Sequence, residues 1–131
     1  MMAQVRSKHN KAEVALRRAL WSRGFRYRLH VRGVFGRPDL VFPKHPVALF
    51  VDGDYWHGRA LKEGGEQQLR QVIRGSRFEW WRDKLATNIE RDEKVTTALL
   101  EQGWQVIRLW ESDVKNDLQK AVESVTKRLS G

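Results

Sequence analysis

The stretch PVALFVDGDYWHG, residues 46–58, starts as a continuous apolar run and ends in a cluster of acidic, aromatic and histidine side chains. An apolar run without polar alternation is typical of a strand that is covered on both faces. In α/β proteins, functional residues commonly lie where such a strand ends. The stretch therefore predicts a central buried strand with a functional loop directly after it.

The residues before this strand predict one helix and two further strands. Asn10 followed by Glu13 has the spacing of a helix N-cap and its partner, and Gly24 should end that helix. FRYRLHV (25–31) alternates apolar and polar residues as a half-exposed strand does, and DLVF (39–42) is typical of a short apolar strand.

The residues after the central strand predict a second set of elements. The polar segment 59–76 contains glycines and is expected to form a mobile, linker-like excursion. Residues 78–103 predict a long helix, 104–111 another buried strand, and 114–129 an amphipathic helix. The order αβββαβα predicts an α/β fold, a mixed sheet flanked by helices, in one domain spanning residues 1–131.

The composition indicates a nucleic-acid partner. The 131 residues include 25 Lys and Arg against 16 Asp and Glu, and the resulting net charge of +9 favours a polyanion. The absence of cysteine excludes a disulfide framework and a thiolate zinc site. No apolar run approaches the ~20 residues that span a bilayer, and MMAQVRSKHNK (1–11) lacks the apolar region of a signal peptide. We therefore expect a soluble, cytoplasmic protein that binds no membrane.

The predicted long helix carries two polar residues on an apolar stripe, because steps of three and four residues return to the same side. A carboxylate at Asp92 must be paired there, since burying it alone costs several kcal/mol. Its partner could be Arg108, in a structural salt bridge, or His57, whose free ring nitrogen could then take a proton from water. The stripe consists of Trp81, Leu85, Asn88, Asp92, Val95 and Leu99.

A second candidate site involves Asp39, which begins a predicted strand after Gly36-Arg37-Pro38. It would lie beside the end of the central strand at Val51. A carboxylate and a strand-end oxygen in this arrangement can hold Mg²⁺, a hard cation that prefers oxygen ligands. Asp is also common at turns, so the Pro-Asp pair is compatible with a structural role.

Six segments together resemble the very short patch repair (Vsr-type) DNA mismatch endonucleases, a branch of the PD-(D/E)xK restriction-endonuclease-like fold. They occur in the family's order over nearly the whole chain, and the match is weakest in residues 59–76. The resemblance implies a Mg²⁺-dependent endonuclease that nicks one strand of double-stranded DNA at a T:G mismatch left by deamination of 5-methylcytosine. The segments are RSKHNKAE (6–13), GFRYRLH (24–30), GRPDLVFP (36–43), FVDGDYWHG (50–58), WWRDKLATNIERD (80–92) and GWQVIRLWE (103–111).

The resemblance also assigns catalytic roles. Asp39 matches the family's metal-binding aspartate, and Val51 matches the residue whose main-chain oxygen joins it on the metal. His57 matches the general base and Asp92 the carboxylate that orients it. Glu13 matches an acidic residue near the metal-bound waters, although helix capping is by itself a sufficient explanation for it.

For DNA binding, the resemblance implies an aromatic wedge that enters the base stack beside the mismatch, formed by Tyr55, Trp56 and Trp81. Core packing is the alternative for Trp81. Lys84 and Asn88 match residues that contact the mismatched bases. The N-terminal arm is expected to add Met2, Arg6 and Lys8.

The chain departs from the family pattern in two places. The family's structural zinc site uses cysteines and a histidine, and the corresponding positions are Asp54, Arg59, Leu61 and Ser112, so we expect no zinc. Asp52 stands where a histidine near the scissile phosphate is often found. Asp52 could ligate the metal or a metal-bound water, but it cannot supply positive charge to the leaving group.

These observations lead to one leading hypothesis and two rivals. The leading one is a monomeric mismatch endonuclease, with repair proteins as candidate partners. The first rival is a restriction or defence nuclease without mismatch specificity. The second is a DNA-binding module that has lost catalysis, and the intact set of Asp39, His57 and Asp92 argues against it.

Overall fold

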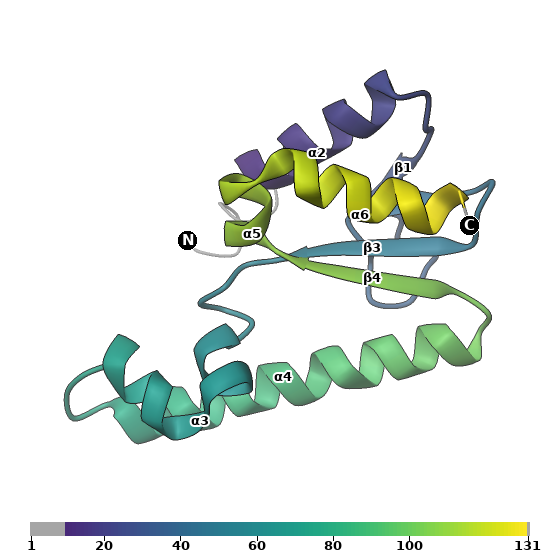
Figure 1. Cartoon of the computed structure of the whole chain (residues 1–131). Coiled ribbons are helices and arrows are strands. Elements are labelled where there is room, and N and C mark those ends of the chain that lie inside the picture. The colour runs from purple at the N-terminus through teal and green to yellow at the C-terminus, as the bar shows by residue number, and fades with distance from the viewer. Residues whose placement is uncertain (1–9, 131) are drawn as a thin grey trace.

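The computed structural model describes residues 10–130, which form a four-stranded mixed sheet flanked by helices (Figure 1). Strand order is β1-β2-β3-β4, in which β1, β2 and β3 are antiparallel neighbours and β3 and β4 are parallel. The predicted α/β class and mixed sheet are confirmed, and the arrangement is consistent with a restriction-endonuclease-like fold. The elements are α2 (Lys11–Ser22), β1 (Arg28–Leu29), β2 (Leu40–Phe42), β3 (Val47–Asp52), α3 (Arg59–Val72), α4 (Phe78–Glu101), β4 (Gln105–Trp110), α5 (Glu111–Asn116) and α6 (Leu118–Ser130).

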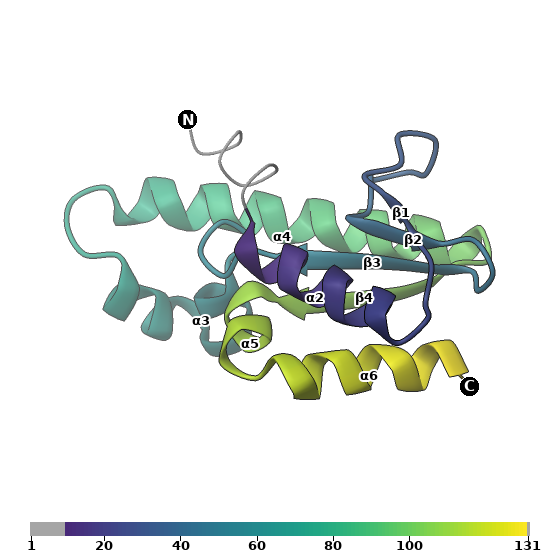
Figure 2. The ribbon, with the colours of Figure 1, turned by 90° about the horizontal axis from the view of Figure 1, so that it is seen from above.

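Strand β3 is the centre of the fold, and every one of its residues is buried. Because successive strand residues point to opposite faces, Leu49 and Val51 face one layer of helices while Ala48 and Phe50 face the other. Helices α2, α5 and α6 cover the first face and α4 covers the second (Figures 1 and 2). The continuous apolar run in the sequence thus reflects coverage on both sides.

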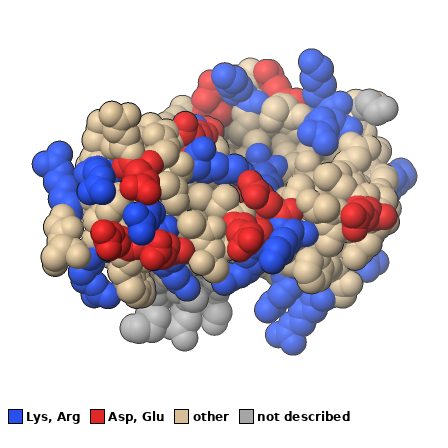
Figure 3. All heavy atoms as spheres, turned by 90° about the horizontal axis from the view of Figure 1, so that it is seen from below, with Lys and Arg blue, Asp and Glu red and all other residues tan. Residues whose placement is uncertain are grey.

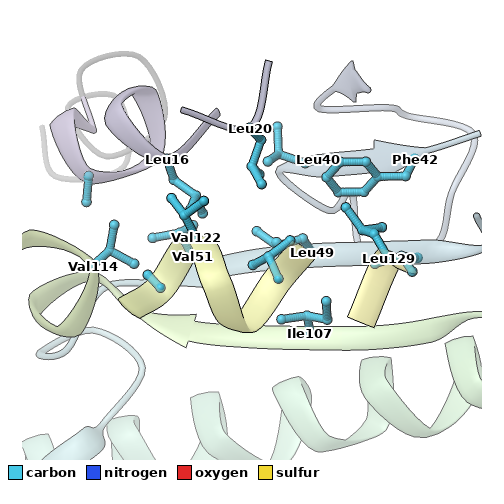
Figure 4. Close-up of a cluster of buried hydrophobic side chains, with 14 residues drawn as sticks. Leu16, Leu20, Leu40, Phe42, Leu49, Val51, Ile107, Val114, Val122 and Leu129 are labelled. Carbon is cyan, nitrogen blue, oxygen red and sulfur yellow. The ribbon is translucent and has the colours of Figure 1, made fainter. Parts of the chain in front are cut away.

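The main core lies between the sheet and helices α2, α5 and α6 (Figure 4). Leu16 and Leu20 of α2 pack there with Val122 and Val125 of α6, all of them almost completely buried. At the start of α2, the side chain of Asn10 accepts a hydrogen bond from the Glu13 main-chain N–H at 3.0 Å, as an N-cap does. The predicted helix start is therefore confirmed.

The prediction for residues 59–76 was wrong, because this segment folds mainly as helix α3. Its glycines indicated a linker, but Leu69 and Ile73 are buried against Phe78 and Leu85 of the neighbouring helix α4. Burial of this apolar face stabilises the helix in spite of the glycines. Gly65, with φ 70° and ψ −167°, interrupts the helix with a kink.

Three smaller predictions also differ from the structure. The half-exposed strand predicted at 25–31 is reduced to β1, whose two residues are exposed. Strand β4 is partly exposed rather than buried, because it lies at the edge of the sheet and pairs with β3 alone. The last predicted helix is divided into α5 and α6 at Asp117, whose carboxylate accepts a hydrogen bond from the Lys120 N–H. Within residues 10–130, no helix has the length and apolarity that a membrane crossing requires.

Candidate active site

The loop of residues 53–58 follows β3 and carries the predicted functional side chains. The His57 N–H donates to the Gly53 carbonyl at 3.0 Å, and the Gly58 N–H donates to the Tyr55 carbonyl at 3.1 Å. Gly58 has a φ of 70°, a conformation that glycine adopts readily, and α3 begins directly after it. These bonds fold the loop tightly at the end of the central strand.

The structure pairs His57 with Asp92. The Nδ1 atom of His57 lies 2.6 Å from Oδ2 of Asp92, although 35 residues separate them in the chain. Both side chains are 19% exposed, so water reaches the pair only in part. Because the carboxylate accepts a hydrogen bond from Nδ1–H, it favours the tautomer in which Nε2 is free to act as a base.

Arg108 of β4 does not take the carboxylate of Asp92 but that of Asp52. Its Nη1 atom lies 3.2 and 3.0 Å from the two carboxylate oxygens of Asp52, which is 6% exposed. The guanidinium also donates to the Thr96 hydroxyl at 2.8 Å and to the main-chain oxygen of Asp92 at 3.2 Å. A structural salt bridge therefore exists, and it leaves the Asp92 carboxylate to His57.

The charges around His57 raise its pKa. Burial lowers this pKa, but the hydrogen bond to Asp92 and the negative charges of Asp52 and Asp92 raise it by more, against an opposing effect of Arg108. Asp52 faces the ring from β3, with its Oδ1 atom 3.8 Å from Nδ1 of His57. His57 is therefore a stronger base than an isolated histidine.

Asp39 also lies at the end of β3, next to Val51. Its Oδ2 atom accepts a hydrogen bond from the Val51 N–H at 2.7 Å, which fixes the carboxylate against the strand. The ring of His30 lies between Asp39 and Glu13, with Nδ1 3.7 Å from Asp39 Oδ1 and Nε2 3.4 Å from Glu13 Oε2. Ligand atoms of these three residues lie within 4.8 Å of one another, close enough to hold one metal ion.

The electrostatics at Asp39 favour a cation. Burial, together with the negative charges of Glu13 and Asp52, raises the pKa of Asp39 to about 6, although the Val51 N–H and His30 oppose the rise. A carboxylate that is costly to ionise in the metal-free protein is stabilised when a divalent cation neutralises it. The carboxylate oxygens of Asp39 and Glu13 fit a hard ion such as Mg²⁺, whereas His30 offers a ring nitrogen.

Glu13 takes part in the helix cap and also lies near Asp39, and its role near metal-bound waters stays a prediction. Its main-chain N–H is bound by the Asn10 cap, while its side chain is buried near Asp39. The carboxylate accepts a hydrogen bond from Arg17 at 3.1 Å, which compensates for the burial of the charge.

The predicted wedge residues form one aromatic group beside the loop. The ring centroid of Trp81 lies 5.4 Å from that of Tyr55 and 6.3 Å from that of Trp56, both edge-on. Tyr55 is 40% exposed, whereas Trp56 and Trp81 are partly buried. The Lys84 ammonium lies 5.7 Å from the centre of the Trp56 ring. Core packing and a DNA-contacting role therefore remain compatible for Trp81.

Asn88 supports the loop. Its side-chain N–H donates to the Trp56 carbonyl at 2.9 Å, and the residue is 4% exposed. Its Oδ1 atom is buried without a hydrogen-bond partner among the described residues. A contact of Asn88 with mismatched bases stays a prediction. Met2, Arg6 and Lys8 lie outside the described residues.

Two residues of this region were not identified from the sequence. His30 joins Asp39 to Glu13, and its φ of 47° is unusual for a residue other than glycine. Trp80, which is 51% exposed, extends the aromatic group and contacts Trp81 edge-on. His30 could have been found as the last residue of a segment paired with the strand that Asp39 begins, and Trp80 as the exposed neighbour of Trp81.

Known proteins match this chain closely. The model of a family described as DNA mismatch endonuclease Vsr matches residues 1–63. The Type II nicking enzyme V.NmeDIP of Neisseria meningitidis serogroup C is 41% identical over 124 residues, which cover 95% of this chain and 80% of that protein. V.HpaIIP of Haemophilus parainfluenzae, also a Type II nicking enzyme, is 36% identical, with coverage of 92% and 81%. The DNA mismatch endonuclease Vsr of Escherichia coli K12 is 27% identical, with coverage of 98% and 78%.

Proposed function

This chain belongs to the Vsr family and is a DNA endonuclease, and from this premise we propose that it nicks one strand of double-stranded DNA at a T:G mismatch in a Mg²⁺-dependent reaction. The observation that carries the proposal is the 2.6 Å contact between His57 and Asp92 at the end of the strand that also fixes Asp39. The residues that we propose as base and as metal ligand therefore both lie near the end of β3.

In the proposed reaction, His57 acts as the general base. Its Nε2 atom takes a proton from a water molecule whose oxygen forms a bond to the scissile phosphorus. The bond from phosphorus to the 3′ oxygen breaks, and this oxygen takes a proton from solvent, which leaves a 5′ phosphate and a 3′ hydroxyl. Asp92 accepts a hydrogen bond from the Nδ1–H of His57 throughout, and so stabilises the imidazolium that forms.

Asp39 and the main-chain oxygen of Val51 would hold the Mg²⁺, with Glu13 near its waters. When bound, the ion would stabilise negative charge on the phosphate and on the leaving oxygen. The raised pKa of Asp39 and the nearby carboxylate of Glu13 support this assignment, because both indicate a site that favours a cation.

The choice of a mismatch is supported by the aromatic group of Tyr55, Trp56 and Trp81. Insertion of a ring between bases costs a few kcal/mol of stacking, and a mismatch has already lost part of that stacking. Figure 3 shows the molecule from the side of α4, and basic and acidic side chains are mixed on this face, so charge alone marks no DNA-binding surface there. The exposed ring of Tyr55 and the cation of Lys84 are therefore the features that we assign to DNA contact.

A second candidate function is nicking of DNA without mismatch specificity. It is favoured by the names of V.NmeDIP and V.HpaIIP, which are more similar to this chain than the Escherichia coli mismatch endonuclease and are called Type II nicking enzymes. Those names describe the relatives. In this chain, the same dyad and metal site would serve either substrate.

A nicking assay on matched duplexes distinguishes the candidates. Two end-labelled duplexes of the same sequence, one with a single T:G pair and one with T:A, are incubated with the protein and either Mg²⁺ or EDTA. We expect a nick in the T:G duplex with Mg²⁺ and not with EDTA. A His57→Ala control should nick about 10²–10⁴ times more slowly, which excludes a contaminating nuclease. Equal nicking of both duplexes would favour a nuclease without mismatch specificity. Binding without any nick would favour a DNA-binding module that has lost catalysis.

A further inference from the structure

A second polar cluster surrounds the side chain of Arg59, the residue that directly follows loop 53–58. Its Nη1 atom lies within 3.1 Å of three acceptors, which are the carboxylates of Asp54 and Asp113 and the hydroxyl of Ser112. Its Nε atom donates to Glu63 at 3.0 Å. One guanidinium therefore joins the loop, the start of α3 and the start of α5. We call these five residues the Arg59 junction.

Asp54 is the acceptor at the centre of the junction. Its Oδ1 atom accepts the Ser112 N–H at 2.9 Å, and its Oδ2 atom accepts the Ser112 hydroxyl as well as Arg59. Burial raises the pKa of Asp54, but the hydrogen bonds from Ser112 and Arg59 lower it by more, so the net shift is downward. The main-chain N–H of Arg59 also donates to the Asp54 carbonyl at 2.9 Å.

The junction coincides with positions at which the resemblance places a structural zinc. Asp54, Arg59 and Ser112 come together in space, whereas Leu61 packs into the apolar cluster between α3 and α4. The donor set does not fit zinc, because it contains no thiolate and its oxygens already bind a permanent cation. Arginine keeps its charge at every physiological pH.

We propose that Arg59 is a positioning residue whose guanidinium replaces a structural zinc ion and holds loop 53–58 against α5. The loop carries Trp56 and His57 one turn away from Asp54. On the other side it is held by Asn88, whose side chain donates to the Trp56 carbonyl. The junction therefore holds the two ends of the loop together, and Asn88 supports its middle.

The planar guanidinium suits this role better than an ammonium would. Nε and Nη1 donate in different directions, toward Glu63 and toward Asp54. A lysine offers a single nitrogen at the end of a flexible chain and cannot reproduce both directions at once. The guanidinium carbon also lies 5.3 Å from the centre of the Trp110 ring, which places an additional cation–π contact at the end of β4.

Hydrogen exchange of the loop tests the proposal without any measurement of activity. In Arg59→Ala, peptides from 53–58 should exchange at least about tenfold faster, while peptides from β3 are unchanged, since local opening depends on local contacts. Arg59→Lys should restore the slow hydrogen exchange of the loop only in part. Lys62→Ala is the matched control, because Lys62 is exposed on the same helix and its substitution also removes one positive charge. Equal exchange in wild type and Arg59→Ala would overturn the proposal.

A milder variant covers the case in which Arg59→Ala does not fold. Ser112→Ala removes one bond to Asp54 and one to Arg59 but retains the guanidinium. It should accelerate exchange in the loop by a smaller factor than Arg59→Ala. An unchanged loop in a folded Ser112→Ala protein would count against the junction.

Metal analysis tests the replacement of zinc. Purified wild-type protein should contain well below one zinc per chain, and a zinc-selective chelator should leave its melting temperature unchanged. One tightly bound zinc per chain would overturn the proposal. Added zinc should not restore the loop in Arg59→Ala, because the remaining oxygen donors form a poor site.

The catalytic consequence rests on the proposed function. Displacement of His57 should lower the single-turnover nicking rate by about 10- to 100-fold in Arg59→Ala, with binding of paired DNA reduced only as far as in Lys62→Ala. If the wild type does not nick DNA, the proposed function fails. The hydrogen-exchange and zinc results would still show whether the Arg59 junction holds the loop. If the wild type nicks and Arg59→Ala nicks equally fast, the positioning role fails alone.

Discussion

Replacement of Asp92 by Asn removes the carboxylate from His57 while it conserves the size of the side chain. The contact is 2.6 Å long and both side chains are mostly shielded from solvent. A hydrogen bond to a charged group contributes about 1.5–3 kcal/mol, and each 1.36 kcal/mol of transition-state stabilisation corresponds to a factor of ten in rate. We therefore expect Asp92→Asn to lower the nicking rate by about 10- to 150-fold. An asparagine that turned its N–H toward Nδ1 would fix the wrong tautomer and increase the loss.

Single-turnover rates of four proteins test this reasoning, namely wild type, Asp92→Asn, His57→Ala and the double variant. His57→Ala should lose about 10²–10⁴ in rate, the usual contribution of a general base. In that background Asp92→Asn should cost less than about threefold, because Asp92 acts through His57. Asp83→Asn is the control, since it removes an exposed carboxylate from the same helix. If Asp92→Asn lowered the nicking rate equally in both backgrounds, Asp92 would not act through His57, and the proposed pairing of the two residues in catalysis would be refuted.

Three further predictions concern the metal, the wedge and pH. Asp39→Ala should abolish nicking in Mg²⁺ while DNA binding, measured by gel shift, is retained, and undiminished nicking would refute the metal site. Trp81→Ala should weaken binding to T:G duplexes much more than to paired duplexes in a fluorescence titration, whereas an equal loss would indicate that Trp81 is core. Burial lowers the pKa of His57, but the hydrogen bond to Asp92 and the charges of Asp52 and Asp92 raise it by more. Because a protonated His57 cannot act as a base, the nicking rate should fall as the pH decreases through this raised pKa. Asp92→Asn should move that fall to lower pH, and a pH profile with no acidic fall would exclude His57 as the base.

Local patterns were enough to predict the elements that depend on local interactions. The Asn10 cap, the buried strand β3 and the long helix α4 all lie where the sequence placed them. A cap needs only residues a few positions apart, and the apolar run of β3 records burial on both faces. The segment of α3 was misread because its stability comes from Leu69 packing against another helix, which glycine spacing does not reveal.

The candidate site shows the same division at the level of single side chains. The sequence indicated that Asp92 needed a partner and left Arg108 and His57 both open. Strand register decided between them. Phe50 pairs with Arg108 in parallel β3 and β4, and this places the guanidinium on the face of the sheet that Asp52 also occupies. Arg108 therefore binds Asp52, and Asp92 is left for His57.

The amino-acid sequence was enough to predict the chemical groups, the helix that Asn10 caps, the central strand and the family to which the chain belongs. The three-dimensional structure was needed to show which charges pair, that His30 lies between Glu13 and Asp39, and that Arg59 binds acceptors from three segments. The difference lies in the sequence separation over which each interaction acts. Caps and hydrophobic periodicity act over a few residues, whereas an ion pair between distant residues depends on the register of strands and the placement of helices, which the whole core fixes together.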